Sequence, residues 1–171
     1  MKIGIASDHR GFDLKNKLIT YLNKKNFEVK DYGTNSQEMV DYTEFAFCIG
    51  ESVSNKEIDF GIVICGTGIG ISIACNKVRG IRCAKVDNVK EAKLTRRDND
   101  ANVLALNGTM PLYRAKDIVD AFFTTNFSGI DRYINRINQI IEYENNNDLV
   151  NKKVKNAKQE KEQKELKKEN E

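Results

Sequence analysis

Short apolar runs alternate with longer amphipathic stretches along most of the chain. Aliphatic and β-branched residues concentrate in five of these runs, a pattern typical of buried or half-buried strands. The predicted strands are Lys2–Ser7, Glu28–Tyr32, Asp59–Cys65, Ile81–Val86 and Asn102–Asn107.

Six stretches between or after these runs have the length and spacing of helices. In the first, Leu14, Leu18 and Leu22 follow the 3.6-residue period of a helix that buries one face. Pro111, the only proline, suits the first turn of a helix, where its missing N–H leaves no hydrogen bond unmade. The predicted helices are Phe12–Lys25, Tyr42–Asn55, Ile69–Val78, Asn88–Arg97, Pro111–Thr124 and Asp131–Glu144.

The repeated alternation of strand and helix predicts an α/β fold with a five-stranded parallel sheet and helices on both faces. Parallel strands require crossover connections, and helices of this length supply them. Ligands of such sheets bind outside the carboxyl ends of the strands. Three loops are therefore candidates for a functional site: Ser7–Gly11, Cys65–Gly70 and Asn107–Thr109.

Composition divides the 171 residues into one ordinary domain and a charged remainder. We expect residues 1–143 to fold, and residues 144–171, rich in Lys, Glu and Asn, to form a tail that is disordered or partly helical. Glutamates alternate with its lysines and no aromatic residue follows Tyr143, which argues against a nucleic-acid-binding arm. The sequence shows neither a membrane-spanning stretch nor a signal pattern, so we expect a cytoplasmic protein without a membrane partner.

Cysteine spacing gives no indication of a metal site or a disulfide framework. The four cysteines lack the C-x-x-C spacing of zinc and dithiol sites, and His9 is the only histidine. We therefore expect no metal. Cys48, Cys75 and Cys83 are interpreted as inert thiols.

Cys65 differs from the other cysteines because it ends a strong strand and precedes a glycine-rich turn, Gly66-Thr67-Gly68-Ile69-Gly70. The glycines allow several backbone N–H groups to face one anion, such as a phosphate or an enolate oxygen. A thiol at this position becomes a usable base. Two alternatives remain: a tight turn without function, and a dinucleotide fingerprint, although the latter requires G-x-G-x-x-G.

Other charged residues are expected near this turn or its ligand. Asp8 and His9 follow the first strand, and therefore lie at the same predicted edge of the sheet as Cys65. Arg132 and Arg136 are four residues apart on a predicted helix, so their guanidinium groups share one face and match a phosphate. The alternatives are a purely structural role for His9 and a solvent-exposed helix face for the two arginines.

These residues together resemble the type B ribose-5-phosphate isomerases, a family that also includes galactose-6-phosphate and allose-6-phosphate isomerases. The resemblance runs from Met1 to about Tyr143. It rests on Asp8-His9 with Gly11, Asp41-Tyr42, the block from Gly61 to Ala74 with Asn76-Lys77, the segment from Asn99 to Leu106, and the pair Arg132 and Arg136.

The resemblance implies a Rossmann-like three-layer sandwich that forms a homodimer or homotetramer, with sites at the subunit interface and no cofactor. It implies an aldose–ketose isomerase that interconverts ribose 5-phosphate and ribulose 5-phosphate through an enediolate. By the match, Cys65 is the base, Thr67 assists it, and the loop N–H groups hold the enediolate. The residues implied to bind substrate are Asp8, His9, Gly66, Gly68, Gly70, Asn99, Arg132 and Arg136.

The chain departs from the family pattern at three positions that bear on substrate choice. Asp98 stands where a ring-opening histidine is usual, and is the candidate for that step here. Asn107-Gly108-Thr109 stands where the family tends to have Gly-Gly-Arg or Gly-Ser-Arg, so one phosphate-binding arginine is missing. Tyr133 stands where a histidine commonly follows Arg132. A six-carbon sugar phosphate, either allose 6-phosphate or galactose 6-phosphate, is therefore an alternative substrate. A nucleotide-binding module without catalytic activity is a further alternative.

Overall fold

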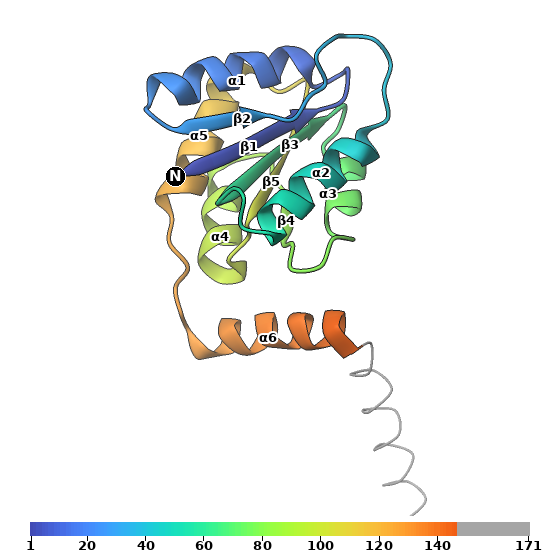
Figure 1. Ribbon diagram of the computed structural model, residues 1–171. Coiled ribbons are helices and arrows are strands. Elements are labelled where there is room, and N and C mark those ends of the chain that lie inside the picture. The colour runs from blue at the N-terminus through green and yellow to red at the C-terminus, as the bar shows by residue number, and fades with distance from the viewer. Residues whose placement is uncertain (147–171) are drawn as a thin grey trace, which may run out of the picture. The chain divides into compact units, whose positions relative to one another are not determined.

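Five parallel strands form one sheet in the order β2-β1-β3-β5-β4 (Figure 1). The computed structural model describes residues 1–146. The strands are β1 (Lys2–Ser7), β2 (Glu28–Asp31), β3 (Phe60–Cys65), β4 (Cys83–Lys85) and β5 (Val103–Asn107). The helices are α1 (Phe12–Lys24), α2 (Tyr42–Ser54), α3 (Ile69–Cys75), α4 (Val89–Asn99), α5 (Leu112–Thr124) and α6 (Asp131–Asn146).

The predicted fold class is confirmed, and the differences lie at element ends. Strands β2, β3 and β5 are each one residue shorter than predicted, whereas β4, which has a ladder partner on one side only, is three residues shorter. Helix α3 ends at Cys75 rather than Val78, and the Asn76 amide then bonds both the N–H and the carbonyl of Cys83, each at 2.8 Å. Pro111 is the residue that precedes α5 rather than a residue of its first turn.

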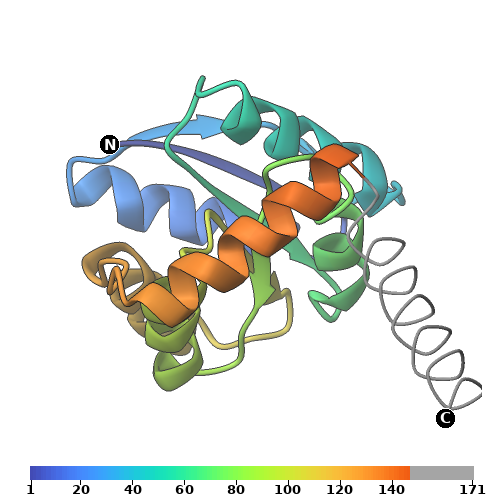
Figure 2. The ribbon, with the colours of Figure 1, turned by 90° about the horizontal axis from the view of Figure 1, so that it is seen from below.

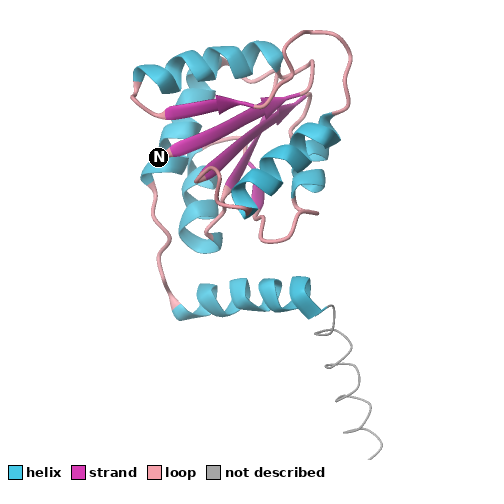
Figure 3. Cartoon of the chain, in the orientation of Figure 1, coloured by secondary structure: helices cyan, strands magenta, loops and turns pink. Residues whose placement is uncertain are grey.

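Helices cover both faces of the sheet, with the strands between them (Figure 3). Helices α1, α4 and α5 bury Leu18, Ala92 and Phe122 against one face, whereas α2 and α3 bury Ile49 and Ile71 against the other (Figure 2). The alternation of side chains along each central strand supplies both cores: Ile62 and Ile64 of β3 face the first group of helices, and Val63 faces the second.

Two paired glycines allow α2 to pack closely on the sheet. Gly4 of β1 lies opposite Gly61 of β3. A methyl group on Gly61 would lie 2.4 Å from Cγ2 of Ile49, and one on Gly4 would lie 2.9 Å from Cδ1 of the same side chain. The absence of side chains at both positions therefore sets the distance between this helix and the sheet.

A buried ion pair joins α1 to the end of β2. The Lys15 side chain is completely buried, and its Nζ lies 2.5 Å from Oδ2 of Asp31. The other oxygen of Asp31 accepts a hydrogen bond from the Gly33 N–H at 2.9 Å. Gly33 and Thr34 in turn exchange backbone hydrogen bonds with Ser7, so the pair supports the segment that lies beside the end of β1.

The chain divides into two compact units, and the second begins at Gly129. The first, Met1–Ser128, contains the sheet and helices α1 to α5, and α6 belongs to the second. Helix α6 extends to Asn146, three residues beyond the predicted end of the folded domain. The rest of the predicted tail, residues 147–171, lies outside the described residues. Within the described part of the chain, no helix is long and apolar enough to cross a membrane.

Candidate active site

A cavity of about 380 Å³ opens at the carboxyl ends of β1 and β3, where the predicted loops meet. The strand order places β1, β3 and β5 side by side, so the loops that follow them are neighbours. The cavity is lined by Asp8, Arg10, Tyr42, Cys65, Gly66, Thr67, Ile69 and Gly70. This arrangement brings the carboxylate and the thiol singled out in the sequence into one cavity.

Cys65 is the last residue of β3 and is 4% exposed. The Gly68 N–H donates a hydrogen bond to its Sγ at 3.2 Å, and the Cys65 carbonyl accepts one from the Gly108 N–H at 2.8 Å. The sulfur is therefore fixed in the cavity wall, with an N–H group directed at the atom that carries negative charge after proton loss.

The turn after Cys65 needs glycine for two distinct reasons. Gly68 has a φ of +78°, which side chains disfavour, and a Cβ there would lie 2.9 Å from the backbone of Leu106. A Cβ on Gly70 would lie 2.8 Å from the hydroxyl of Tyr42. The N–H groups of Gly66 and Thr67 have no acceptor among residues 1–146, so both are available to a bound oxyanion.

Thr67 takes part in the turn itself. Its Oγ1 accepts a hydrogen bond from the Ile69 N–H at 3.2 Å. The hydroxyl proton has no partner among the described residues and is available to a ligand.

Asp8 follows β1 and is 5% exposed. Its Oδ1 accepts hydrogen bonds from the Arg10 and Gly11 N–H groups, at 2.9 and 3.0 Å. Its Oδ2 has no hydrogen-bond donor among the residues that the structure describes. One oxygen therefore fixes the turn, and the other is available in the cavity to accept a hydrogen bond from a ligand hydroxyl.

His9 is half-buried beside the loop that follows β2. The Val40 N–H lies 3.3 Å from its Nδ1, and the Val40 carbonyl oxygen is also 3.3 Å away. In the neutral tautomer in which Nδ1 accepts the Val40 N–H, Nε2 carries the proton and is a hydrogen-bond donor. His9 does not line the cavity, but it lies in the same loop as Asp8.

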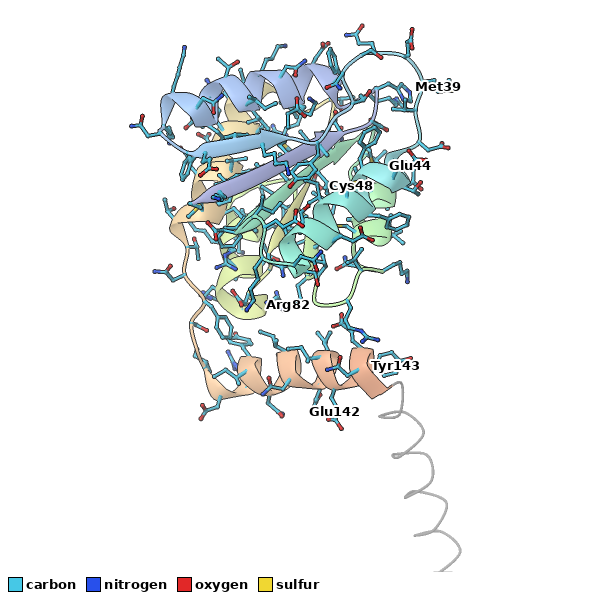
Figure 4. All side chains as sticks on the ribbon, viewed as in Figure 1. Met39, Glu44, Cys48, Arg82, Glu142 and Tyr143 are labelled. Atoms are coloured by element: carbon cyan, nitrogen blue, oxygen red, sulfur yellow. The ribbon has the colours of Figure 1, made fainter. Side chains whose placement is uncertain are left out.

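Asp98 and Asn99 lie at the other edge of the sheet. Helix α4 runs antiparallel to the strands, so its last residues lie near the amino ends of the strands (Figure 1). Arg82, which bonds the Asn99 carbonyl at 2.9 Å, marks this edge in Figure 4, and Met39 and Glu44 mark the opposite edge. One chain therefore does not bring these two residues to Cys65. The carboxylate of Asp98 accepts hydrogen bonds from Arg97 at 2.7 and 3.1 Å.

Arg132 and Arg136 belong to α6, in the second unit. Both guanidinium groups stack near the ring of Tyr133, with their central carbons 4.6 and 5.9 Å from its centroid. Arg132 also donates a hydrogen bond to the Tyr133 hydroxyl at 2.7 Å. The aromatic ring therefore lies beside both cations, which keeps the two positive charges close together.

Tyr42 lines the cavity, although the sequence assigned it no role. It is the first residue of α2, and its ring lies against Gly70. No periodicity or spacing indicates this contact, because it depends on how α2 packs on α3.

The remaining thiols differ from Cys65 in their surroundings. Cys75 is buried, and Cys48 is exposed on α2 (Figure 4). A hydrogen bond with Cys75, together with burial, raises the pKa of the Cys83 thiol well above its ordinary value. Among the described residues, no group of three or more His, Cys, Asp or Glu side chains is arranged to hold a metal ion.

Comparison with known proteins relates this chain and its fold to sugar-phosphate isomerases. The family model described as Ribose/Galactose Isomerase matches residues 3–140. The Escherichia coli protein named ribose-5-phosphate isomerase B is 43% identical over 129 residues, which cover 75% of this chain and 87% of that protein.

Solved structures give the same result. A Clostridium thermocellum ribose-5-phosphate isomerase B is 48% identical, with a TM-score of 0.83 over 85% of this chain and 98% of that one. A Mycoplasma genitalium ribose-5-phosphate isomerase B, solved with bound ribulose-5-phosphate, is 42% identical. Its TM-score is 0.80 over 85% of this chain and 97% of that one.

Proposed function

We propose that this chain, which belongs to the ribose/galactose isomerase family, interconverts ribose 5-phosphate and ribulose 5-phosphate. Membership of the family confirms the predicted resemblance and makes the chain an isomerase. The choice of this substrate is supported by the relatives named above, among them the Mycoplasma genitalium protein with ribulose-5-phosphate bound. The observation that carries the proposal is the Cys65 thiol, which shares a cavity with Asp8 and accepts the Gly68 N–H.

The reaction requires a base at C2 and donors for an oxyanion. Cys65 Sγ removes the C2 proton of the open-chain aldose, a C1–C2 double bond forms, and the electrons of the C1 carbonyl move to O1, which gives the enediolate. The O2 proton then transfers to O1, the thiol returns its proton to C1, and the C2 carbonyl of the ketose forms. The backbone N–H groups of the loop stabilise the negative charge between these steps, since they are fixed before the reaction begins.

Other residues of the same loops bind and orient the sugar. The available oxygen of Asp8 orients the hydroxyls at O1 and O2 and exchanges protons with them, and the Thr67 hydroxyl assists the thiol. His9 Nε2, with Arg132 and Arg136, holds the phosphate. Gly66, Gly68 and Gly70 contribute backbone N–H groups of the loop, and the absence of side chains at Gly66 and Gly70 leaves the space that Arg10 and Tyr42 occupy.

The substrate is closed as a furanose for most of the time, so a ring-opening step precedes isomerisation. The C1–O4 bond breaks, the ring oxygen gains a proton and the O1 hydroxyl loses one. We assign this transfer to Asp98, with Asn99 as a ligand for substrate hydroxyls. Both residues lie near the amino ends of the strands, whereas Cys65 of the same chain lies at a carboxyl end. They therefore act in the site of a second copy of the chain.

Exposed apolar residues beside the catalytic loop support such a homo-oligomer. Ile69 and Ile73, one turn apart on α3, are 54% and 56% exposed. Phe47 of α2 is also exposed, at 39%. Apolar surface of this kind is usual at subunit interfaces. We propose a homodimer, alone or within a homotetramer, in which each site combines Cys65 of one subunit with Asp98 and Asn99 of its partner.

Mixing inactive variants tests this arrangement. Cys65→Ala and Asn99→Ala subunits, each with strongly reduced turnover alone, are expected to regain about a quarter of wild-type activity when unfolded and refolded together, because half of the dimers then contain one intact site. Cys65→Ala mixed with Thr67→Ala is the control, since changes in the same loop never leave one site intact. Activity no greater than the sum of the separate variants would show that Asn99 acts in its own chain.

Substrate choice is tested by the ratio of kcat/KM values for ribose 5-phosphate, allose 6-phosphate and galactose 6-phosphate. We expect ribose 5-phosphate to be preferred by about tenfold or more, since an additional CH–OH group must otherwise fit between the loops. A higher kcat/KM for either six-carbon sugar phosphate would assign the chain to that substrate instead. Such a result would agree with its departures from the family pattern at Asp98, Thr109 and Tyr133.

A further inference from the structure

The side chain of Arg10 lies where the loops after β1, β3 and β5 meet. It begins in the loop after β1 and extends over the loop after β3: a Cβ on Gly66 would lie 3.0 Å from both its Cδ and its Nε. A Cβ on Gly108, after β5, would lie 2.6 Å from the Arg10 carbonyl oxygen. Two glycines therefore leave the space in which this arginine lies, directly beside the residue that follows Cys65.

The backbone of Arg10 is fixed, whereas its guanidinium group is available to a ligand. The N–H of Arg10 donates to Asp8 Oδ1, and the next residue, Gly11, bonds both Oδ1 and the carbonyl of Asp8. The guanidinium group has no hydrogen bond or ion pair with any of residues 1–146, and Arg10 is exposed. A rigid turn therefore carries a cation whose donors are unused.

Arg10 also has a distinct place in the charge distribution at this edge of the sheet. Among the loops that follow the five described strands, it is the only residue with a full positive charge, whereas Asp8, Glu38, Asp41 and Asp87 are acidic. In the loop after β5, the N–H and the hydroxyl of Thr109 both donate to Asn107 Oδ1, each at 2.8 Å. That loop contains no cationic side chain that could bind an anion.

We propose that Arg10 binds the phosphate group of the sugar phosphate. This inference rests on the proposed function and adds a binding residue to the same site. The planar guanidinium group matches phosphate oxygens with two parallel hydrogen bonds. The enediolate end of the substrate is held by backbone N–H groups near Cys65, and Arg10 is adjacent to His9, which we also assign to the phosphate.

Two substitutions at Arg10 and one matched control test the proposal. Arg10→Ala is expected to raise KM for ribose 5-phosphate, and the Kd for inorganic phosphate measured by calorimetry, by about tenfold to a hundredfold, with kcat nearly unchanged. Arg10→Lys keeps the positive charge but loses the planar guanidinium group with its paired N–H donors. Its KM and phosphate Kd should therefore lie between those of Arg10→Ala and the wild type. Arg79→Ala removes an exposed arginine from the loop between α3 and β4, at the other edge of the sheet, and should change neither constant.

An unchanged KM and phosphate Kd in Arg10→Ala would overturn the proposal. A fall in kcat alone would also overturn it, because that result assigns Arg10 to the enediolate. If the wild-type protein does not isomerise ribose 5-phosphate, the proposed function has failed. The phosphate titration then decides the role of Arg10 independently of any turnover.

Discussion

Replacing Cys65 with alanine is expected to abolish the exchange of the substrate C2 proton with solvent. The variant lacks the group to which we assign the proton transfer, so turnover should fall by at least about 10²- to 10⁴-fold. Proton NMR in D₂O follows the loss of the C2 signal directly, and a coupled assay follows ketose formation. Binding of inorganic phosphate should remain close to that of the wild type, because the phosphate contacts are assigned to other residues.

Matched thiol variants separate this effect from a general sensitivity to cysteine loss. Cys48→Ala removes an exposed thiol from α2, and Cys83→Ala removes one whose raised pKa keeps it protonated at neutral pH. Both variants should keep their turnover. Cys65→Ser preserves the size of the side chain, but a serine hydroxyl does not ionise near neutral pH and cannot take the place of the thiol as the base, so this variant should resemble Cys65→Ala. Substantial turnover in Cys65→Ala would remove Cys65 from the role of base.

Replacing Asp31 with asparagine is expected to destabilise the fold by about 3 kcal/mol, because it leaves the ammonium group of Lys15 buried without a counter-charge. The Lys15 side chain is 0% exposed and that of Asp31 is 36% exposed, so water reaches the carboxylate but not the amine. The partial exposure of Asp31 places the effect at the lower end of the range for broken buried pairs, about 3–5 kcal/mol. Urea unfolding followed by circular dichroism measures the difference.

A substitution of Lys15, the other member of the ion pair, provides the comparison. Lys15→Met keeps an unbranched apolar chain in the same space and leaves Asp31 able to reach solvent, so it should cost less than Asp31→Asn. If Lys15→Met proves the more destabilising change, packing of the lysine stem outweighs the ion pair. Because Asp31 also bonds Gly33, which in turn pairs with Ser7, Asp31→Asn should loosen the segment beside Asp8 as well.

The order and type of the elements could be predicted from the sequence alone. Aliphatic runs such as Asp59–Cys65 and stripes such as Leu14, Leu18 and Leu22 reflect which side chains must leave water, and that requirement is local. The length of β4 could not be predicted in the same way. Its ends depend on its position at the edge of the sheet, which is a property of the strand order.

Part of the candidate site could likewise be predicted from the sequence, and part is visible only in the structure. The sequence places Asp8, Cys65 and Thr67 directly after two strands, and the rule for parallel sheets then predicts that they share one edge. The structure brings all three into one cavity. It also places Tyr42 against Gly70 and Arg10 over Gly66, contacts that depend on how separate elements pack. No spacing along the chain encodes those contacts.

Hydrophobic periodicity, glycine and the position of Cys65 therefore determined the fold class and the candidate base. Only the tertiary structure decided that Lys15 is buried against Asp31, that Arg10 lies over the catalytic loop, and that Asp98 and Asn99 lie at the opposite edge from Cys65. The physical reason is the range of the interactions involved. Burial patterns and backbone preferences act between residues close in sequence, whereas the geometry of a site depends on distances between elements that the chain brings together only when it folds.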